Sequence, residues 1–237
     1  MSRARRRPPN YPPPRLPAWD PGDHPKMSDP FSQEAWDERY RSRDALWSGN
    51  PNPHLVAAAG ELLPGHALDV GAGEGADAIW LASRGWHVIA VDLSTVALER
   101  ACAHADKAGP DIAARIDWVH EDVTCWDPGP GRYDLVSVQY MHLPPAPRQA
   151  MVERLARSVA PGGSLLMVGH HPTDLQTTVP RPNMPELFFT GDDIAAELDP
   201  GQWTIITNAA PGRIVDDPEG NAVTVHDTVL RAMRRVN

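Results

Sequence analysis

The residues best suited to binding a ligand form a cluster of acids and glycines at residues 69–77. A short apolar run over residues 67–70 predicts a buried strand, and three alternating glycines follow it before a helical pattern begins. A strand, a glycine turn and a helix bring a nucleotide-like ligand to the helix N-terminus. Asp92 ends the next apolar run about 20 residues later, where a carboxylate can accept hydrogen bonds from both hydroxyls of a ribose. The cluster therefore predicts a site for a nucleotide-like ligand.

Two further acids distinguish between the ligands that fit this pattern. The glycine spacing with Asp92 also matches the dinucleotide fingerprint, so a dinucleotide is an alternative at this point. Asp69, however, lies inside the first strand, where an unpaired buried carboxylate costs several kcal/mol, so we expect it to face a cation or donors. An acid in that place would repel a pyrophosphate. Asp122 ends the third apolar run, and with the apolar Val123 it suits the amino group and ring of an adenine.

The histidines that follow the fourth and fifth predicted strands are candidates for contact with a substrate. They are His142, after the fourth strand, and His170 and His171, after the fifth. Folds of this kind bind ligands at the carboxyl ends of parallel strands. His142 is also the candidate catalytic residue, as a general base, and an ordinary loop position is the alternative for each histidine. No third residue has the spacing of a metal ligand, so the sequence predicts no metal site.

These residues depend on an alternation of strands and helices that begins at Gly65. The predicted strands are 67–71, 87–92, 116–120, 133–139 and 163–169. The predicted helices are 75–84, 94–106 and 145–159. Nearly continuous apolar strands such as 135–138 are typical of a parallel sheet that is covered on both faces.

The alternation ends after the fifth strand. Residues 170–190 are rich in proline and irregular, and a short helix is predicted near 191–198. Two strands, 203–208 and 223–231, close the chain. The link over 209–222 contains turn residues and no helical pattern, so we expect the two strands to pair antiparallel.

The residues before the alternation divide into a tail and a front end. Residues 1–29 are rich in proline and arginine, and because this composition cannot bury a core, we predict a disordered tail. Residues 30–237 are predicted to form one domain. Its front end is predicted to contain a helix over 32–43 and a second helix over 53–63.

Three aromatic residues of the front end are candidates for the ligand site. Trp36 and Tyr40 lie four residues apart on one face of the first predicted helix, and Trp47 stands in a loop of turn-forming residues. We expect these side chains either to pack in the core or to form an aromatic flap over the glycine turn.

Composition argues against several functions. The net charge of −9 disfavours non-specific binding to nucleic acid or to anionic membranes. No apolar run approaches the ~20 residues of a membrane-spanning helix. Cys102 and Cys125 are the only cysteines, lack the spacing of metal ligands, and are expected to be reduced thiols in the cytoplasm.

The stretch from Trp36 to Arg231 resembles the class I S-adenosylmethionine-dependent methyltransferases. Residues 69–75 resemble the family's first motif, residues 133–136 its fourth-strand motif, and residues 160–163 the turn before its fifth strand. The resemblance implies a doubly wound, Rossmann-like α/β fold. This is a three-layer sandwich around a seven-stranded, mostly parallel sheet with an antiparallel C-terminal strand.

The front end resembles more narrowly the thiopurine and tellurite-resistance branch, the TehB-like methyltransferases. Residues 36–40 resemble the paired aromatics of that branch, and residues 46–51 resemble its entry loop. Residues 139–142 lack the arginine that thiopurine enzymes carry there, which argues against a thiopurine substrate.

The resemblance implies that the turn and the acids bind S-adenosyl-L-methionine. It assigns the ribose to Asp92, the adenine to Asp122 with Val123, and the ammonium of the methionine part to Asp69. The implied cofactor-binding residues are Trp36, Trp47, Asp69, Gly71, Ala72, Gly73, Gly75, Asp92, Leu93, Asp122, Val123 and Gln139. The candidate substrate residues are Tyr40, His142, His170 and His171.

The sequence therefore predicts methyl transfer from S-adenosyl-L-methionine to a small molecule, with S-adenosyl-L-homocysteine as product. The expected acceptor is a soft sulfur, selenium or tellurium nucleophile, or a heterocyclic or phenolic metabolite. An NAD(P)-dependent oxidoreductase and a non-catalytic S-adenosylmethionine-binding module are the alternatives. A nucleic-acid base methyltransferase would need an Asn/Asp-Pro-Pro-aromatic run after the fourth strand, which residues 139–145 lack. The acceptor, the need for a general base and the oligomeric state are left open.

Overall fold

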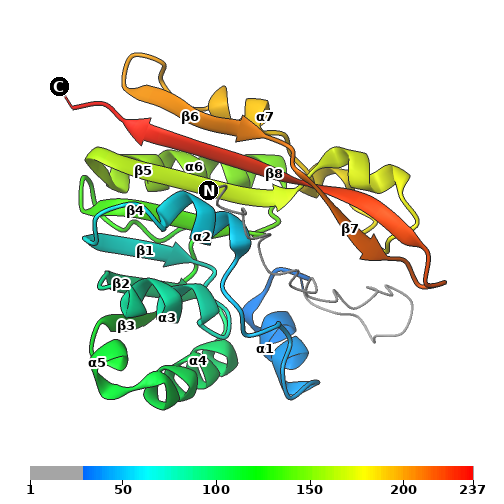
Figure 1. Cartoon of the computed structure of the whole chain (residues 1–237), viewed down its shortest axis with the longest axis horizontal. Helices are drawn as coiled ribbons and strands as arrows, with labels where there is room; N and C mark the ends of the chain where they lie inside the picture. Colours follow the sequence, from blue (N-terminus) through cyan, green and yellow to red (C-terminus); the bar gives the residue numbers. More distant parts are fainter. Residues whose placement is uncertain (1–28, 237) are drawn as a thin grey trace, which may run out of the picture.

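The computed structural model describes residues 29–236, so the predicted disordered tail, residues 1–29, lies outside the described residues except for Asp29. One long sheet runs through the molecule in the strand order β3-β2-β1-β4-β5-β8-β6 (Figure 1). Its parallel part consists of β3 (Ile116–His120), β2 (His87–Asp92), β1 (His66–Val70), β4 (Tyr133–Gln139) and β5 (Val159–His170). The long strand β8 (Ala222–Arg234) pairs antiparallel with both β5 and β6 (Trp203–Ala209).

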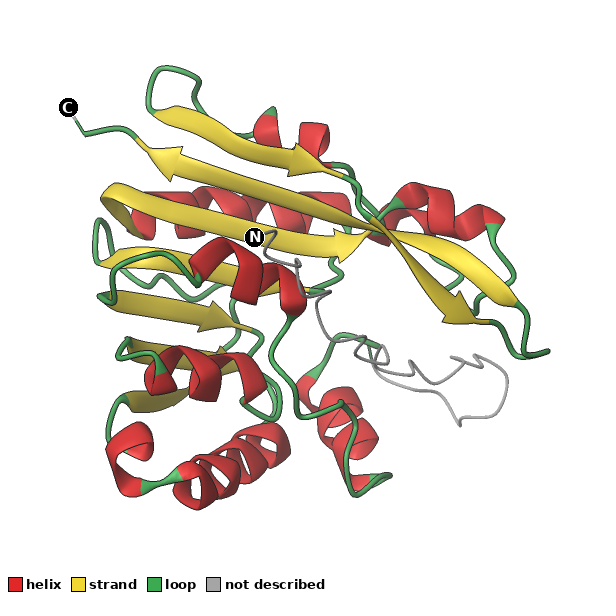
Figure 2. Cartoon of the chain, in the orientation of Figure 1, coloured by secondary structure: helices red, strands yellow, loops and turns green. Residues whose placement is uncertain are grey.

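Helices cover both faces of this sheet, which gives three layers (Figure 2). One face is covered by α6 (Pro145–Ser158) and α7 (Gly191–Ala195), and the other by α2 (Pro53–Ala59), α3 (Ala76–Ser83) and α4 (Thr95–Ala108).

The central strand β5 explains why both faces need cover. Leu165 and Met167 pack in the core on the α6 side, whereas Leu166 and Val168 pack in the core on the α2 side. A strand that is apolar on both faces is stable only between two layers of helices. The predicted doubly wound α/β fold is therefore confirmed, including the antiparallel ending.

Most predicted elements agree with the observed ones in the parallel part of the sheet. β5 is the exception, because it begins at Val159 rather than at residue 163 and includes residues 160–163, which were predicted as the turn before it. The observed bounds of β2, β3 and β4 coincide with the predicted strands, and α6 ends one residue before its predicted end. The largest difference in a predicted helix is in α2, which ends at Ala59 rather than at residue 63. Gly60 follows it, and glycine is a poor helix former.

The prediction that 209–222 is only a turn-containing link is wrong, because β7 (Gly212–Asp216) forms within it. β8 is longer than predicted and extends beyond the end of β5. Residues 227–233 of β8 pair with β5, while residues 222–226 pair with β7. β7 and β8 form a hairpin across the short turn 217–221, and a strand of only five residues carries little signal of its own.

Three further short elements were not predicted. They are α5 (Pro110–Ala113) and the 3-10 turns η1 (Pro172–Gln176) and η2 (Pro185–Leu187). Each begins with a proline, whose fixed φ suits the first position of a helical turn. These elements are too short to show a helical period in the sequence.

The topology brings the candidate residues to one edge of the sheet. The carboxyl ends of β1, β2, β4 and β5 carry the glycine turn, Asp92, residues 139–142 and His170. Helix α1 (Gln33–Arg41) lies beside α4, at the edge toward which the arrows of β1 and β5 point (Figure 1). Within residues 29–236, no helix has the length and apolar character that crossing a membrane requires.

Candidate functional site

The glycine turn after β1 depends on backbone conformations that favour glycine. Gly71, Gly73 and Gly75 have φ angles of 72°, 54° and 85°, in the left-handed region. A Cβ at Gly71 would lie 2.7 Å from Met141 Cε, and one at Gly75 would lie 2.7 Å from Trp118. Both glycines therefore allow a neighbouring side chain to pack closely against the backbone, in addition to allowing the turn itself.

The amides of the turn are largely engaged within the protein. The N–H groups of Gly71 and Ala72 donate to the carbonyl of Val91 at 2.8 and 3.0 Å. Asp92, at the end of β2, accepts from the N–H of Gly73 through Oδ2 and from that of Ser94 through Oδ1, both at 2.8 Å. The turn is thus fixed against the end of β2, and its glycines offer a ligand close approach.

A group of acids surrounds the turn. Asp69 is only 2% exposed, and within residues 29–236 its Oδ2 has no hydrogen-bond partner. Burial, and then the carboxylates of Asp77 and Asp92, raise the pKa of Asp69. Burial raises the pKa of Asp77 to about 6, although its Oδ1 accepts from the N–H of Asn52 at 2.6 Å. An unpartnered carboxylate among other acids is a site that favours a bound cation.

Another acid attaches the front end to the turn. Glu74 Oε2 accepts from the N–H groups of Leu46 and Trp47, both at 3.1 Å. Its second oxygen forms an ion pair with Arg100 of α4 at 2.9 Å. Glu74 thus links the entry loop to the glycine turn.

A similar contact attaches α1. Asp37 accepts from Ser94 Oγ at 2.6 Å and from the N–H of Val96 at 3.3 Å. Burial raises the pKa of Asp37, but these hydrogen bonds outweigh burial and leave that pKa below its ordinary value. The sequence analysis missed Asp37, Glu74 and Asp77 as positioning residues, because their partners are distant in sequence.

The front-end aromatics lie over the turn, in the arrangement of the predicted flap. The indole Nε1 of Trp47 donates to the Tyr40 hydroxyl at 3.0 Å. A Cβ at Gly73 would meet both of these atoms, at 3.3 and 3.0 Å. Trp36 packs on Tyr40 with ring centroids 6.3 Å apart, and the Arg39 guanidinium lies 4.6 Å from the centre of the Trp36 ring.

The residues assigned to an adenine lie on the neighbouring strand ends. His120, the last residue of β3, pairs with Asp92, so that Asp122 follows two residues beyond this pair. Asp122 Oδ1 accepts from the N–H and the hydroxyl of Thr124 at 2.8 and 2.7 Å. Val123 is buried in the core on the α6 side.

Two further predicted residues border this region. The carbonyl of Leu93 lies 2.9 Å from His120 Nε2. Gln139, at the end of β4, donates to Ser137 Oγ at 2.9 Å. Its Oε1 is buried and has no hydrogen-bond partner in the described part of the chain.

The structure brings two of the three candidate histidines together. His142 and His170 stack with ring centroids 4.8 Å apart and an interplanar angle of 15°. His171 turns away, because its Nδ1 lies 2.9 Å from Thr173 Oγ1 and its ring packs edge-on against His226.

The segment before His142 is strained. Tyr140 has a φ of 51°, an uncommon value for a residue other than glycine. This turn places Met141 against Gly71 and His142 on His170. Burial and the neighbouring Asp227 carboxylate raise the pKa of the Tyr140 hydroxyl.

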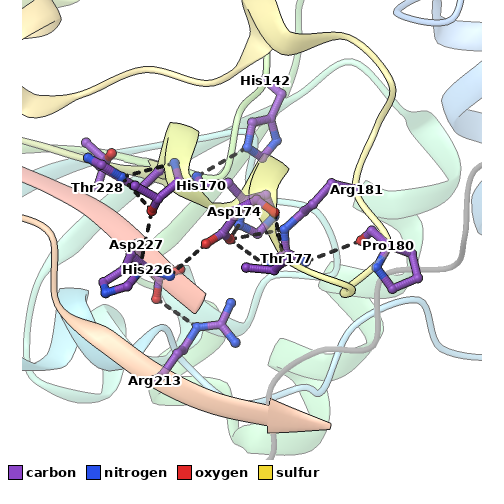
Figure 3. A network of polar contacts seen from close by, with 12 residues as sticks. His142, His170, Asp174, Thr177, Pro180, Arg181, Arg213, His226, Asp227 and Thr228 are labelled. Carbon is purple, nitrogen blue, oxygen red and sulfur yellow. Dashed lines mark hydrogen bonds and ion pairs between the residues drawn. The ribbon is translucent and has the colours of Figure 1, made fainter. Parts of the chain in front are cut away.

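Two buried carboxylates that the sequence analysis missed lie behind the histidines (Figure 3). Asp174 accepts from Arg181 Nη2 at 2.7 Å and from the N–H of His226 at 2.7 Å. Asp227, within β8, lies 2.9 Å from Arg213 Nε and 3.1 Å from His54 Nε2. Burial raises the pKa of Asp227, but the bonds from His54 and Arg213 outweigh it and hold the pKa at about 2. An acid inside an apolar strand was the available signal for Asp227, as it was for Asp69.

The described residues contain no group of three or more His, Cys, Asp or Glu side chains arranged to hold a metal ion. Cys102 and Cys125 are both exposed and unpaired.

Comparison with known proteins identifies the family that the chain resembles. Residues 67–163 match the family model described as a methyltransferase domain. A probable thiol methyltransferase 2 from Arabidopsis thaliana is 30% identical over 141 residues, which cover 57% of this chain. The match spans 61% of that relative, which is less than two thirds of its length.

Solved structures show the same fold. TehB from Haemophilus influenzae matches with a TM-score of 0.63 and 18% identity, over 86% of this chain and 67% of TehB. The Burkholderia thailandensis 1,6-didemethyltoxoflavin-N1-methyltransferase, solved with 1,6-didemethyltoxoflavin and S-adenosylhomocysteine, matches with a TM-score of 0.62 and 20% identity. That match covers 86% of this chain and 87% of the neighbour. The matched methyltransferase domain and the shared fold agree with the predicted resemblance to class I S-adenosylmethionine-dependent methyltransferases, and TehB shares that fold.

Replacing Glu74 by Gln should loosen the entry loop. The amide removes the charge that strengthens the hydrogen bonds from Leu46 and Trp47 and the pair with Arg100. We expect hydrogen exchange at the Leu46 and Trp47 amides to accelerate at least tenfold, with a loss of about 1–2 kcal/mol in unfolding free energy. Glu99→Gln, on the exposed face of α4, is the matched control. Unchanged exchange in Glu74→Gln would contradict the role given to this side chain.

Replacing Asp77 by Asn should change how stability depends on pH. The folded state raises the pKa of Asp77, so it binds a proton more tightly than the unfolded state, and this group lowers stability as pH rises from about 4 to 7. Urea unfolding should show the wild type losing on the order of 1–3 kcal/mol relative to Asp77→Asn across this range. The exposed Asp106→Asn is the control, and parallel pH curves for wild type and Asp77→Asn would refute the prediction.

Proposed function

We propose that this chain, whose residues 67–163 match the methyltransferase domain family, is an S-adenosylmethionine-dependent methyltransferase with a small-molecule acceptor. The observation that carries the proposal is the unpartnered Oδ2 of the buried Asp69, beside Asp77 and Asp92. These carboxylates favour a ligand that carries both a ribose and a positive charge. The pyrophosphate of a dinucleotide would instead face three acids, which argues against the NAD(P)-dependent alternative.

The residues around the turn fit each part of such a cofactor. Asp92 is held by two amides and retains lone pairs for the ribose hydroxyls. Asp122 and Val123 follow the adjacent strand and suit the adenine. Asp69 is assigned to the ammonium of the methionine part, because a hydrogen-bonded cation would satisfy its free oxygen.

The chain's own contribution to the reaction is to bind, orient and exclude water. The bound sulfonium supplies the methyl group. Trp47 and Tyr40 cover the turn, and Met141 lies on Gly71, so that the acceptor is confined to the edge beside His142. Positioning of aligned reactants supplies effective molarities of ~10⁵ M or more, which makes alignment the main requirement.

The acceptor is assigned to small molecules, for two reasons. The Arabidopsis relative is named as a thiol methyltransferase, and the Burkholderia neighbour as an N1-methyltransferase with a bound heterocyclic compound. Both names favour a soft or heterocyclic nucleophile.

The exposed, unpaired thiols of Cys102 and Cys125 favour a reducing compartment such as the cytoplasm.

Replacing Asp92 by Ala should weaken cofactor binding at least tenfold. The change removes the acceptor for the ribose hydroxyls and the partner of the Gly73 amide, and hydrogen bonds to a charged group are worth ~1.5–3 kcal/mol. Titration calorimetry with S-adenosylmethionine and S-adenosylhomocysteine measures the effect. Asp117→Ala, an exposed acid on β3, should bind as the wild type does. Equal affinity of Asp92→Ala and wild type would refute the assignment.

Turnover is tested by incubation with methyl-labelled S-adenosylmethionine and a panel of thiols, phenols, N-heterocycles and oxyanions. Transfer to at least one acceptor, abolished or greatly reduced in Asp92→Ala at low cofactor concentration, supports an enzyme. Tight cofactor binding without transfer to any acceptor favours a binding module. Binding of NAD(P) in place of S-adenosylmethionine would support the oxidoreductase.

A further inference from the structure

The stacked pair His142–His170 contains a buried imidazole without a partner in the described structure. His170 is 3% exposed, and within residues 29–236 neither its Nδ1 nor its Nε2 forms a hydrogen bond. Its nearest acid oxygen, on Asp174, is 4.0 Å from Nδ1, which is beyond hydrogen-bond distance. Buried polar atoms are nearly always satisfied, so an orphaned ring at a functional edge indicates a bound polar group.

The pair stands beside the cofactor turn. His142 follows Met141, whose Cε packs against Gly71, and His170 ends the adjacent strand β5. Aromatic rings surround the two imidazoles. Tyr140 lies 4.9 Å from His170, and Phe188 lies 6.2 Å from each histidine, measured between ring centroids.

The carboxylates near the two imidazoles already form ion pairs with other residues (Figure 3). Asp174, on η1, is bound by Arg181 at 2.7 Å. Asp227, on β8, is bound by Arg213 of β7 at 2.9 Å and by His54 of α2 at 3.1 Å. Both acids are thus largely neutralised by these cations, which weakens the stabilisation that they offer to a positive charge on an imidazole.

A third arginine adds positive charge. Arg148, on α6, is buried, and its guanidinium lies 5.1 Å from the centre of the Phe189 ring. Among residues 29–236 it has no carboxylate within ion-pair distance. Its charge nevertheless acts to lower the pKa of Asp193 and that of Glu197.

The surroundings of both imidazoles disfavour their protonation. Burial, followed by the charge of Arg181, lowers the pKa of His142 to about 4. Burial, His142 and Arg181 lower the pKa of His170, and the opposing effect of Asp227 is smaller. A neutral imidazole of such low basicity is a poor general base near neutral pH but remains an N–H donor.

We propose that the His142–His170 pair is the acceptor subsite and that it takes acceptors as anions, with an imidazole N–H donating to an ionised oxygen or sulfur. This inference rests on the proposed methyltransferase function and specifies its substrate class. The acceptor loses its proton to solvent before transfer. The ionised atom then forms a bond to the methyl carbon as the carbon–sulfur bond of the sulfonium breaks, and that electron pair stays on sulfur. No protein base takes part.

The test uses two coloured probes, 4-nitrophenol and 4-nitrobenzenethiol, whose ionised forms absorb visible light. They are titrated into the full-length protein saturated with S-adenosylhomocysteine, over a range of pH. We expect the bound probe to ionise at least one pH unit below the free probe. The methylated analogue 4-nitroanisole, which cannot ionise, should bind at least tenfold more weakly than the nitrophenolate.

The variants His170→Phe and His142→Phe keep the ring packing. The first removes the unpartnered ring, and the second removes the ring whose Nε2 accepts the backbone N–H of His170 at 3.5 Å. Each should weaken binding of the ionised probe at least tenfold and return its ionisation toward that of the free probe. His142 is partly exposed, so its variant keeps the test valid if His170→Phe fails to fold. His87→Phe is the matched control, because His87 also packs on a histidine, His66, at the opposite edge of the sheet.

The outcomes separate this proposal from the proposed function. Binding of S-adenosylhomocysteine is measured first, by calorimetry. If it binds, but the probes bind only as neutral molecules, do not bind, or bind both variants unchanged, the anionic subsite is wrong and the methyltransferase stands. If it does not bind, the proposed function fails, and the same titration without the nucleoside still tests the anion subsite.

Discussion

The burial of carboxylates around one glycine turn is the constraint on which the rest of the site depends. A buried acid needs a partner, and each of these acids finds a different one. Glu74 accepts hydrogen bonds from the amides of the entry loop, and Asp77 accepts one from the amide of Asn52. Asp37 accepts a hydrogen bond from Ser94, at the start of α4. Asp92 is held by the turn itself. The same requirement thus docks the front end onto the sheet and leaves Asp69 Oδ2 without a hydrogen-bond partner among residues 29–236.

The parallel half of the fold could be predicted from the sequence because its signals are local. Apolar runs, glycines and prolines mark β2, β3 and β4 at their observed bounds. The strand β7 was missed because it has only five residues and lies among turn-forming residues, which mask its pairing with residues 222–226 of β8. In the site, motif spacing identified Asp69, Asp92 and the turn. Arg148 and Arg181 carried no such signal, because charged residues in a proline-rich segment or on a helix are normally exposed.

The two sides of the site differ in charge, although the whole chain is acidic. Acids line the turn, whereas the imidazoles at the ends of β4 and β5 lie among two acids that arginines neutralise and the further cation Arg148. In the proposed reaction, a cationic donor meets an anionic acceptor and both products are less charged. A buried site of low dielectric strengthens the attraction between such reactants, and it does so most where each is bound on the side of opposite charge.

The part of β8 that extends beyond β5 has a different pairing partner from the rest of the strand. Residues 227–233 complete the sheet with β5, and residues 222–226 pair only with β7. Asp227 lies at the junction of these two parts, where it pairs with Arg213 of β7 and with His54 of α2. The β7–β8 hairpin therefore lies outside the pairing that sets the register of the main sheet, and a single buried carboxylate fastens it to the helix layer on the α2 side.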